Sequence, residues 1–442
     1  MERGEKCLCT KQEDKQAMDM TFFSVDKRLA DLSDKAEDRA RDAFAAIDAI
    51  AEYNQQKVLS AFIRHNVSES HFVPTTGYGY GDRGRDALDE ILADIMGAED
   101  ALIRHSIVSG THAITIALFA MLRPGDTLLA ATGAPYDTLE QVIGHKTPSA
   151  GSLTEYGVGY KQVELTDVGT PDLLGIQDTL RSDDSIRVVH IQRSRGYNTR
   201  PSLTIAWIER IIKAVRAVRE DVTVFVDNCY GEFVERQEPC QVGADLIAGS
   251  LIKNPGGGIA ENGGYLCGTK ECIEQCAYRM TTPGLGREVG ASLGHNRTLY
   301  MGLFQSPHVV GEAMKTAVYA ASLFELLGYH ISPTVDEIRG DIIQTVFLNN
   351  AENLIAFCQG MQKGAPVDSF VVPEPWDMPG YTSQVIMAAG AFTMGASIEL
   401  SADAPLREPY AAYMQGGLNY ASGKIGVLLA AQSMLERGYL FN

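Results

Sequence analysis

The chain has 442 residues and a formal net charge of -18, with 45% hydrophobic and 21% charged residues. This length exceeds what one hydrophobic core usually organises, so we expect a large domain with a smaller companion. The acidic excess repels phosphate backbones and anionic lipid, and no basic cluster interrupts it. Nucleic acids and membrane surfaces are therefore not expected partners.

The residues up to Asp19 are polar and lack the apolar core of a signal peptide, and no apolar run is long enough to span a membrane. We therefore expect a cytoplasmic protein. The eight cysteines are too few for a disulfide scaffold in a chain of this length. Their spacings, including Cys7-x-Cys9, match no paired metal motif, so reduced thiols and no metal site are expected.

Apolar residues recur at helical spacing from residue 18 to 67, which predicts one or two amphipathic helices. Residues 75–82 are rich in glycine and tyrosine, have no period, and are expected to form an exposed loop. A further helix is predicted through Leu88, Ile91 and Ile95.

From about residue 100 to 300, short β-rich runs alternate with helical stretches, which is typical of a parallel sheet covered by helices. The helical pattern from 202 to 218 is predicted to be one of the crossovers between strands. We expect an α/β fold with three parts: a helical segment at 1–75 that packs on a partner subunit or on the small domain, a large domain at 76–310 with a mainly parallel sheet, and a small α+β domain at 311–442.

Two polar residues follow β-rich runs of the predicted sheet. Asp227 comes directly after the run 223–226, and Lys253 comes shortly after the run 245–248. Parallel sheets bind ligands at the carboxyl ends of their strands, so these two side chains are expected to meet there. A lysine amine condenses with an aldehyde, and a carboxylate keeps a pyridine nitrogen protonated, as pyridoxal 5′-phosphate (PLP) chemistry requires. The alternative is a surface lysine and an aspartate that caps a helix.

A helix predicted to open at Gly110 and Thr111 adds a third feature. Free backbone N–H groups and the positive end of the helix dipole make this turn a candidate phosphate site, to which Ser250 can add a hydroxyl. Tyr136 follows the next strand and is a candidate to stack on the pyridine ring, with core packing as the alternative. His112 is a second candidate for stacking or for a hydrogen bond. Together these residues predict a PLP site.

The chain resembles PLP enzymes of the aspartate-aminotransferase-like fold, and among them the methionine γ-lyase-like group often labelled aluminium-resistance proteins. The resemblance extends from about Ala51 to Leu429. It is carried by residues 76–80 (Thr-Gly-Tyr-Gly-Tyr), 108–114 (Val-Ser-Gly-Thr-His-Ala-Ile), 249–258 (Gly-Ser-Leu-Ile-Lys-Asn-Pro-Gly-Gly-Gly) and 373–381 (Pro-Glu-Pro-Trp-Asp-Met-Pro-Gly-Tyr). The resemblance implies that Lys253 holds PLP as a Schiff base and that Asp227 contacts the ring nitrogen.

In related cystathionine lyases and synthases, a neighbouring subunit sends a tyrosine and an arginine to the phosphate. The matching loop here makes Tyr78, Tyr80 and Arg85 the candidates, with Tyr80 also a candidate catalytic residue. The local pattern Tyr-Gly-Asp-Arg-Gly-Arg differs from the Tyr-Ser-Arg of the relatives, which leaves Arg83 as an alternative to Arg85. The resemblance implies shared active sites in a homo-oligomer, with a dimer as the catalytic unit and a homotetramer as the assembly.

The same relatives bind the substrate carboxylate with an arginine of the C-terminal domain. Arg407 is the candidate here, and a structural ion pair with a nearby acidic residue is the alternative. Gln192 follows a strand where relatives contact the phenolic oxygen of the cofactor. Arg193 and Arg195 beside it are candidates for substrate contacts, with their roles left open.

The resemblance favours a PLP-dependent lyase of amino-acid metabolism in which Lys253 removes the α-proton and a group leaves from Cγ or Cβ. One alternative is a γ-replacement synthase or an aminotransferase, which would use the same lysine and aspartate. Another is a non-catalytic PLP-fold protein linked to metal tolerance. Glu399 and Asp403 are expected to be capping groups or to lie outside the first layer of contacts.

Overall fold

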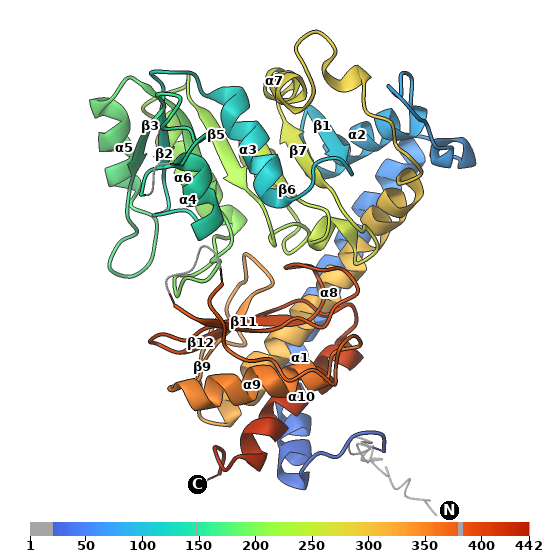
Figure 1. Ribbon diagram of the computed structural model, residues 1–442, viewed down its shortest axis with the longest axis vertical. Helices are drawn as coiled ribbons and strands as arrows, with labels where there is room; N and C mark the ends of the chain where they lie inside the picture. The colour runs from blue at the N-terminus through green and yellow to red at the C-terminus, as the bar shows by residue number, and fades with distance from the viewer. Residues whose placement is uncertain (1–20, 147–148, 379–382, 442) are drawn as a thin grey trace, which may run out of the picture.

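The computed structural model describes residues 21–146, 149–378 and 383–441, which form two layered units crossed by two long helices (Figure 1). Cys7 and Cys9 lie outside the described residues. The helices are α1 (Lys27–Arg64), α2 (Arg83–Met96), α3 (Gly110–Met121), α4 (Asp137–Ile143), α5 (Leu173–Ser182), α6 (Ile205–Arg216), α7 (Lys270–Met280), α8 (Asn296–Leu326), α9 (Ala351–Lys363) and α10 (Tyr420–Glu436), with short 3₁₀ turns η1 (Glu69–Phe72), η2 (Pro239–Val242), η3 (Asn254–Gly256) and η4 (Gly286–Glu288). The strands are β1 (Asp100–Arg104), β2 (Thr127–Ala130), β3 (Gly159–Gln162), β4 (Ile186–Gln192), β5 (Thr223–Asp227), β6 (Leu246–Ser250), β7 (Gly264–Gly268), β8 (His330–Ser332), β9 (Gln344–Phe347), β10 (Val385–Ala388), β11 (Ser401–Pro405) and β12 (Ala411–Gln415).

The larger sheet has seven strands in the order β1-β7-β6-β5-β4-β2-β3. Strands β6, β5, β4, β2 and β3 run parallel, whereas β7 is antiparallel to both of its neighbours. Successive side chains of the buried strands point to opposite faces, where helices cover them. One face, with Leu128, Val188, Phe225 and Leu246, packs against α3, α4 and α7, and the other, with Leu129, Val189, Val224 and Ile247, packs against α5 and α6. The predicted mainly parallel, helix-covered sheet is confirmed.

The helix predicted from residue 202 begins later, at Ile205. Thr204 is its N-cap, because the Thr204 hydroxyl accepts a hydrogen bond from the Trp207 backbone N–H at 3.4 Å. The preceding segment instead approaches the small sheet, since the Ser202 hydroxyl accepts a hydrogen bond from the Gly340 N–H at 3.1 Å. The helix therefore begins directly after its cap, Thr204, which lies three residues beyond Pro201.

A single helix, α1, occupies most of the apolar segment near the N-terminus and packs along α8. At its start, the Asp26 N–H donates to Gln432 Oε1 of α10 at 2.9 Å. Further along, Asn54 donates to the carbonyl oxygens of Phe233 and Glu235, each at 3.0 Å. α1 thus contacts both layered units of its own chain. The boundary predicted at 310 falls inside α8, and the three-part division stays a prediction.

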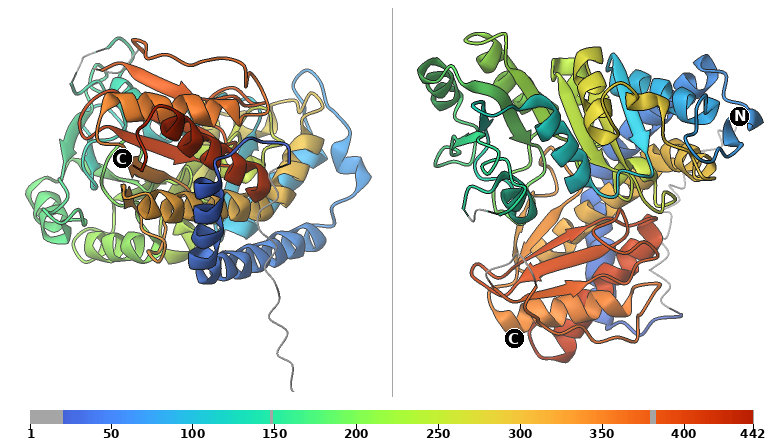
Figure 2. Two further views of the ribbon diagram at one scale, coloured as in Figure 1. Left: turned by 90° about the horizontal axis from the view of Figure 1, so that it is seen from below. Right: turned by 45° about the horizontal axis from the view of Figure 1, so that its top comes forward.

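The smaller sheet has five strands in the order β10-β11-β12-β9-β8, all antiparallel to their neighbours. α9 packs on this sheet and α10 packs on α9, on the side away from the larger sheet (Figure 2). The other face of the smaller sheet therefore points towards the carboxyl ends of the large parallel strands. Of the helices within the described ranges, none combines the length and the apolar character that crossing a bilayer requires.

Candidate active site

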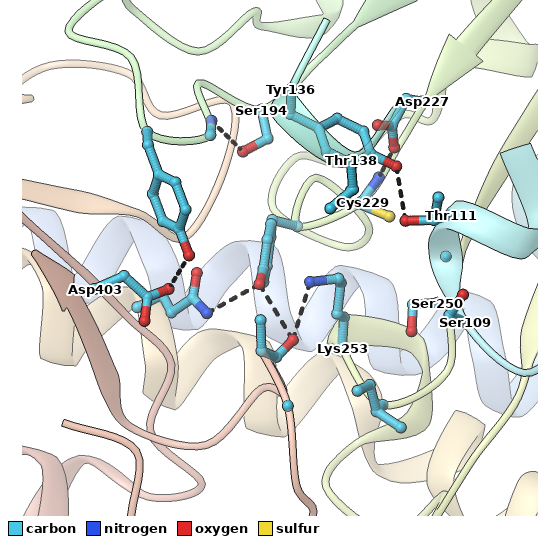
Figure 3. Close-up of a pocket in the computed structure, with 18 of the residues that line it drawn as sticks. Ser109, Thr111, Tyr136, Thr138, Ser194, Asp227, Cys229, Ser250, Lys253 and Asp403 are labelled. Carbon is cyan, nitrogen blue, oxygen red and sulfur yellow. Dashed lines mark hydrogen bonds between the residues drawn. The ribbon is translucent and has the colours of Figure 1, made fainter. Parts of the chain in front are cut away.

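A cavity of about 480 Å³ lies between the carboxyl ends of β4, β5 and β6 and the strands β11 and β12 of the smaller sheet. Elements that are far apart in the sequence contribute to its wall, including the start of α3 and the loop before β11 (Figure 3). The predicted site residues that line it are Gly110, Thr111, Tyr136, Gln192, Asp227, Ser250 and Lys253. Asp227 and Lys253 thus line one cavity, where the strand-end rule places them.

Asp227 is the last residue of β5 and is 4% exposed. Its Oδ1 atom accepts a hydrogen bond from the Cys229 backbone N–H at 3.1 Å. Burial raises the pKa of the Asp227 carboxyl, because a charge is costly where water is excluded, although Lys253 and Arg200 act against this effect. A protonated ring nitrogen beside Asp227 would supply the opposite charge that this position favours.

Lys253 lies just beyond β6, at the N-cap of η3. Its Nζ donates a hydrogen bond to the Ala396 carbonyl oxygen at 2.9 Å and lies 3.6 Å from the centre of the Tyr230 ring. Burial lowers the pKa of the Lys253 amine, but the neighbouring Tyr230, Cys229 and Asp227 more than offset this and raise the pKa overall. The amine is therefore held in the cavity as a cation, between a loop of the smaller unit and an aromatic ring.

The start of α3 forms one end of the cavity, the candidate anion-binding end. Ser109 caps the helix, since its hydroxyl accepts the His112 N–H at 3.0 Å. A Cβ atom on Gly110 would lie 3.1 Å from Cys229 Sγ and 3.2 Å from the Ser250 Cβ, so only glycine leaves this approach free of crowding. The first N–H groups of a helix have no partner within the helix, and they suit a phosphate. Ser250 lines the same end of the cavity.

Of the two candidates for stacking, Tyr136 lines the cavity and His112 does not. The Tyr136 hydroxyl is hydrogen-bonded to Thr111 Oγ1 at 3.0 Å, and its backbone N–H donates to Gln192 Oε1 at 3.0 Å. Burial raises the pKa of the phenol well above its usual value, which keeps it protonated. His112 instead accepts the Val108 N–H through Nδ1 at 3.2 Å. An amine, a carboxylate, an anion site and a ring together fit PLP.

Arg193, Arg195 and Arg407 do not line the cavity. Arg193 is fully buried and donates to Asn228 Oδ1 at 2.8 Å and to Glu235 Oε1 at 3.0 Å. The Arg195 guanidinium donates to the Ser332 carbonyl oxygen at 3.0 Å, and Arg407 is exposed. The first two arginines connect loops to one another, because their donors meet protein acceptors.

The loop predicted between residues 75 and 82 carries two exposed tyrosine rings. Tyr78 and Tyr80 stack with ring centres 5.6 Å apart and are 69% and 60% exposed. The buried Arg85 donates to the carbonyl oxygens of Gly79 at 2.9 Å and Gly290 at 3.1 Å, so it stabilises the loop. Arg83 is exposed. None of these four side chains lines the cavity of its own chain.

Several residues that line the cavity were not among the predicted site residues. Tyr230, whose ring supports Lys253, comes three positions after Asp227, so an inspection of the whole loop beyond β5 would have found it. Asp403 and Gln415 come from β11 and β12. Asp403 was expected to be a capping group or to lie further out, yet it lines the cavity. No local pattern shows which strand of one sheet faces the other sheet.

Comparison with known proteins gives a consistent result. The family described as methionine gamma-lyase matches residues 29–435. The protein YnbB of Bacillus subtilis (strain 168) is 51% identical over 392 residues, which cover 88% of this chain and 93% of YnbB. The solved carbon-sulfur lyase involved in aluminum resistance from Clostridium novyi NT is 51% identical with a TM-score of 0.89, over 92% of this chain and 96% of that one.

More distant structures bear on the fold alone. The pyridoxal-5′-phosphate dependent protein YhfS from Escherichia coli has a TM-score of 0.55 at 17% identity, over 87% of this chain and 96% of that one. This likeness confirms the predicted aspartate-aminotransferase-like fold. With the match over most of the described residues, it follows that the chain belongs to the methionine γ-lyase family.

Proposed function

We propose that the chain is a PLP-dependent lyase that eliminates a group from Cγ or Cβ of an amino acid. The single observation that carries this proposal is that Lys253, Asp227 and the start of α3 line one cavity. Membership of the methionine γ-lyase family and similarity to the Clostridium novyi carbon-sulfur lyase support the reaction class. Bound PLP would supply an aldehyde for an amine and a ring that accepts electrons.

Lys253 is the proposed base that takes the α-proton of the substrate. The Tyr230 ring and the Ala396 carbonyl oxygen hold the Lys253 amine in the cavity, where it could accept this proton. Asp227 would hold the ring nitrogen of bound PLP in its protonated form. Because Asp227 is buried and already accepts the Cys229 N–H, its orientation is set before a ligand arrives.

The remaining cofactor contacts follow from the geometry of the α3 end. The N–H groups of Gly110 and Thr111, with the Ser250 hydroxyl, are proposed to bind the phosphate. Tyr136 is proposed to cover the ring, and Gln192 positions it through the 3.0 Å hydrogen bond to its backbone N–H. For substrate, we retain Arg407 as the proposed carboxylate-binding residue. Arg193 and Arg195 are proposed to act by positioning the loop after β4.

The charges of the cavity support a shared active site. Among the described residues that line it, Lys253 is the one cationic side chain, beside the carboxylates of Asp137, Asp227 and Asp403. A dianionic phosphate needs a further cation close by. We propose that a neighbouring subunit supplies it from the exposed Arg83, with Tyr78 and Tyr80 nearby in the sequence; Arg85, the other candidate, would first have to leave its contacts with Gly79 and Gly290. A homodimer would then be the catalytic unit, and the tetramer remains our expectation for the assembly.

A substrate screen tests the reaction. The purified enzyme, loaded with PLP, is incubated with β- and γ-substituted amino acids, and 2-oxo acid, ammonia and the released group are measured. A lyase produces all three in equal amounts without a second substrate. A requirement for a second amino acid or a 2-oxo acid would identify a replacement synthase or an aminotransferase instead.

Lys253→Ala is the matched control for the screen. We expect it to lose the visible absorbance of lysine-bound PLP and all turnover, because no other cationic side chain lines the described cavity. Turnover that persists in Lys253→Ala would contradict the assignment of the lysine. A wild-type protein that takes up PLP but converts no amino acid would contradict the enzyme proposal itself.

A further inference from the structure

Asp403 presents an unpaired carboxylate oxygen in the wall of the cavity. It lies on β11 and is 3% exposed. Its Oδ2 atom accepts a hydrogen bond from the Tyr197 hydroxyl, whereas Oδ1 has no hydrogen-bond partner among the described residues. A buried carboxylate oxygen without a donor is costly, so such a group indicates a partner that binds there.

The position of Asp403 is fixed from several sides. Its backbone is paired with Tyr413 of β12 and Met387 of β10. The Tyr197 ring, which comes from the loop after β4, lies 5.6 Å from the Tyr413 ring. Main-chain pairing and the tyrosine contact therefore hold the carboxylate at the interface between the two units, and a ligand would meet it already oriented.

The cofactor contacts do not use this carboxylate. Asp227 serves the ring nitrogen in the proposed function, and Asp137 is exposed to solvent at the rim. Asp403 lies on the opposite side of Lys253 from Ser109, Thr111 and Ser250, which form the anion-binding end (Figure 3). A substrate whose amino group reacts beside Lys253 and whose side chain points away from the anion-binding end would bring that side chain to Asp403. A carboxylate there attracts a cation and repels an anion.

We propose that Asp403 determines specificity by binding a positively charged group at the far end of the substrate side chain, so that preferred substrates are amino acids with a second amino group. The proposal rests on the proposed function, since it assumes that the α-amino group of the substrate reacts beside Lys253. A charge-assisted hydrogen bond from the ammonium group would satisfy the open oxygen of Asp403.

Two isosteric substrates isolate this contact. S-(2-aminoethyl)-L-cysteine and S-propyl-L-cysteine have side chains of the same length and differ in a terminal ammonium or methyl group. We expect wild-type kcat/KM to favour the ammonium substrate by about tenfold or more. Asp403→Asn keeps the shape and removes the charge, and we expect it to abolish most of that preference, a loss of about tenfold or more, mainly through KM.

Asp137→Asn is the matched control, because it removes one carboxylate from the exposed rim of the same cavity. It should leave the preference between the two substrates at its wild-type value. An equal loss for both substrates in Asp403→Asn would overturn the proposal, because it would place the carboxylate at the shared α-amino end. If Asp137→Asn reduced the preference as much as Asp403→Asn does, the proposal would also be overturned, because the preference would then reflect the total charge of the cavity.

A binding measurement on the wild-type protein gives an independent test that needs neither variant. L-Lysine and L-2-aminoheptanoic acid are isosteric and lack a leaving group, and their binding is followed through the visible absorbance of the PLP-loaded protein. Tighter binding of lysine supports the role of Asp403. Equal binding overturns that role but leaves the lyase proposal intact, whereas no absorbance change with either compound, together with no turnover in the substrate screen, contradicts both.

Discussion

Asp227 combines the two properties that an electron-accepting ring needs from its partner: burial and a fixed orientation. Replacing it with asparagine keeps the size and the hydrogen bond from Cys229 but removes the charge that stabilises a protonated nitrogen. We expect Asp227→Asn to bind PLP and to reduce kcat by about 10²–10³-fold. Steady-state kinetics on a substrate found by the screen would measure the loss.

Asp245→Asn is a suitable control for that variant, because Asp245 precedes β6 at the opposite end of the sheet, where it forms an ion pair with Arg216. It should retain a kcat near the wild-type value. If Asp227→Asn retained a similar kcat, the carboxylate would not be the partner of the ring.

For single residues, the sequence predicted those whose position depends only on the strand that precedes them. Asp227, Lys253 and Gly110 each lie at the end of a β-rich run or at the helix start after one, and the rule that parallel strands bind ligands at their carboxyl ends brings them together. That rule did not predict where the side chain of Arg193 points. Its side chain turns to Asn228 and Glu235, and only the folded loops decide whether a buried arginine faces the cavity or another loop.

Within strand β4, His190 is a buried histidine whose Nε2 has no hydrogen-bond partner among the described residues. Burial lowers its pKa from 6.5 to about 4. Between these values the unfolded chain binds a proton that the folded chain excludes, so stability falls as the pH falls through this window. From pH 7 to pH 5, His190 should account for about 2 kcal/mol of lost stability.

Urea denaturation of the wild type and of His190→Gln at both pH values checks this expectation. The variant should lose less stability on acidification, because its side chain does not titrate. His330→Gln, which replaces an exposed histidine at the start of β8, should behave as the wild type does. If all three proteins lose the same stability, His190 does not contribute.

Whether a segment forms a helix or a strand was largely predictable from the sequence. The residues at which each helix or strand begins and ends depended on tertiary contacts. The spacing of apolar residues near the N-terminus predicted helical structure but did not decide between one helix and two. The sequence of α1 does not show that α8 packs along its length and stabilises it as a single helix. The start of α6 at Ile205 depended on which residue would cap it. The location of Asp403 depended on the docking of the two sheets, which local patterns do not encode.

For the whole molecule, the shared site makes a prediction about mixed oligomers. Tyr80→Phe and Lys253→Ala should each be nearly inactive alone. If Tyr80 acts in the site of a neighbour, a mixed dimer has one site with both native residues. Co-refolding equal amounts should therefore restore about a quarter of the wild-type activity. No recovery on mixing would mean that the two residues serve the same chain's site, and wild-type activity of Tyr80→Phe alone would mean that Tyr80 has no catalytic part.

Helix α1 extends from α10 to the loop after β5 and therefore restricts movement between the two units. Ser33 and Tyr319 are hydrogen-bonded through their hydroxyls at 2.7 Å, and Ser322 donates to the Ala36 carbonyl at 3.0 Å, so α1 and α8 are fastened together inside the protein. A rotation of one unit relative to the other would require α1 and α8 to slide along each other. We therefore expect the distance between Lys253 on one unit and Ala396 on the other to change little when an amino acid binds.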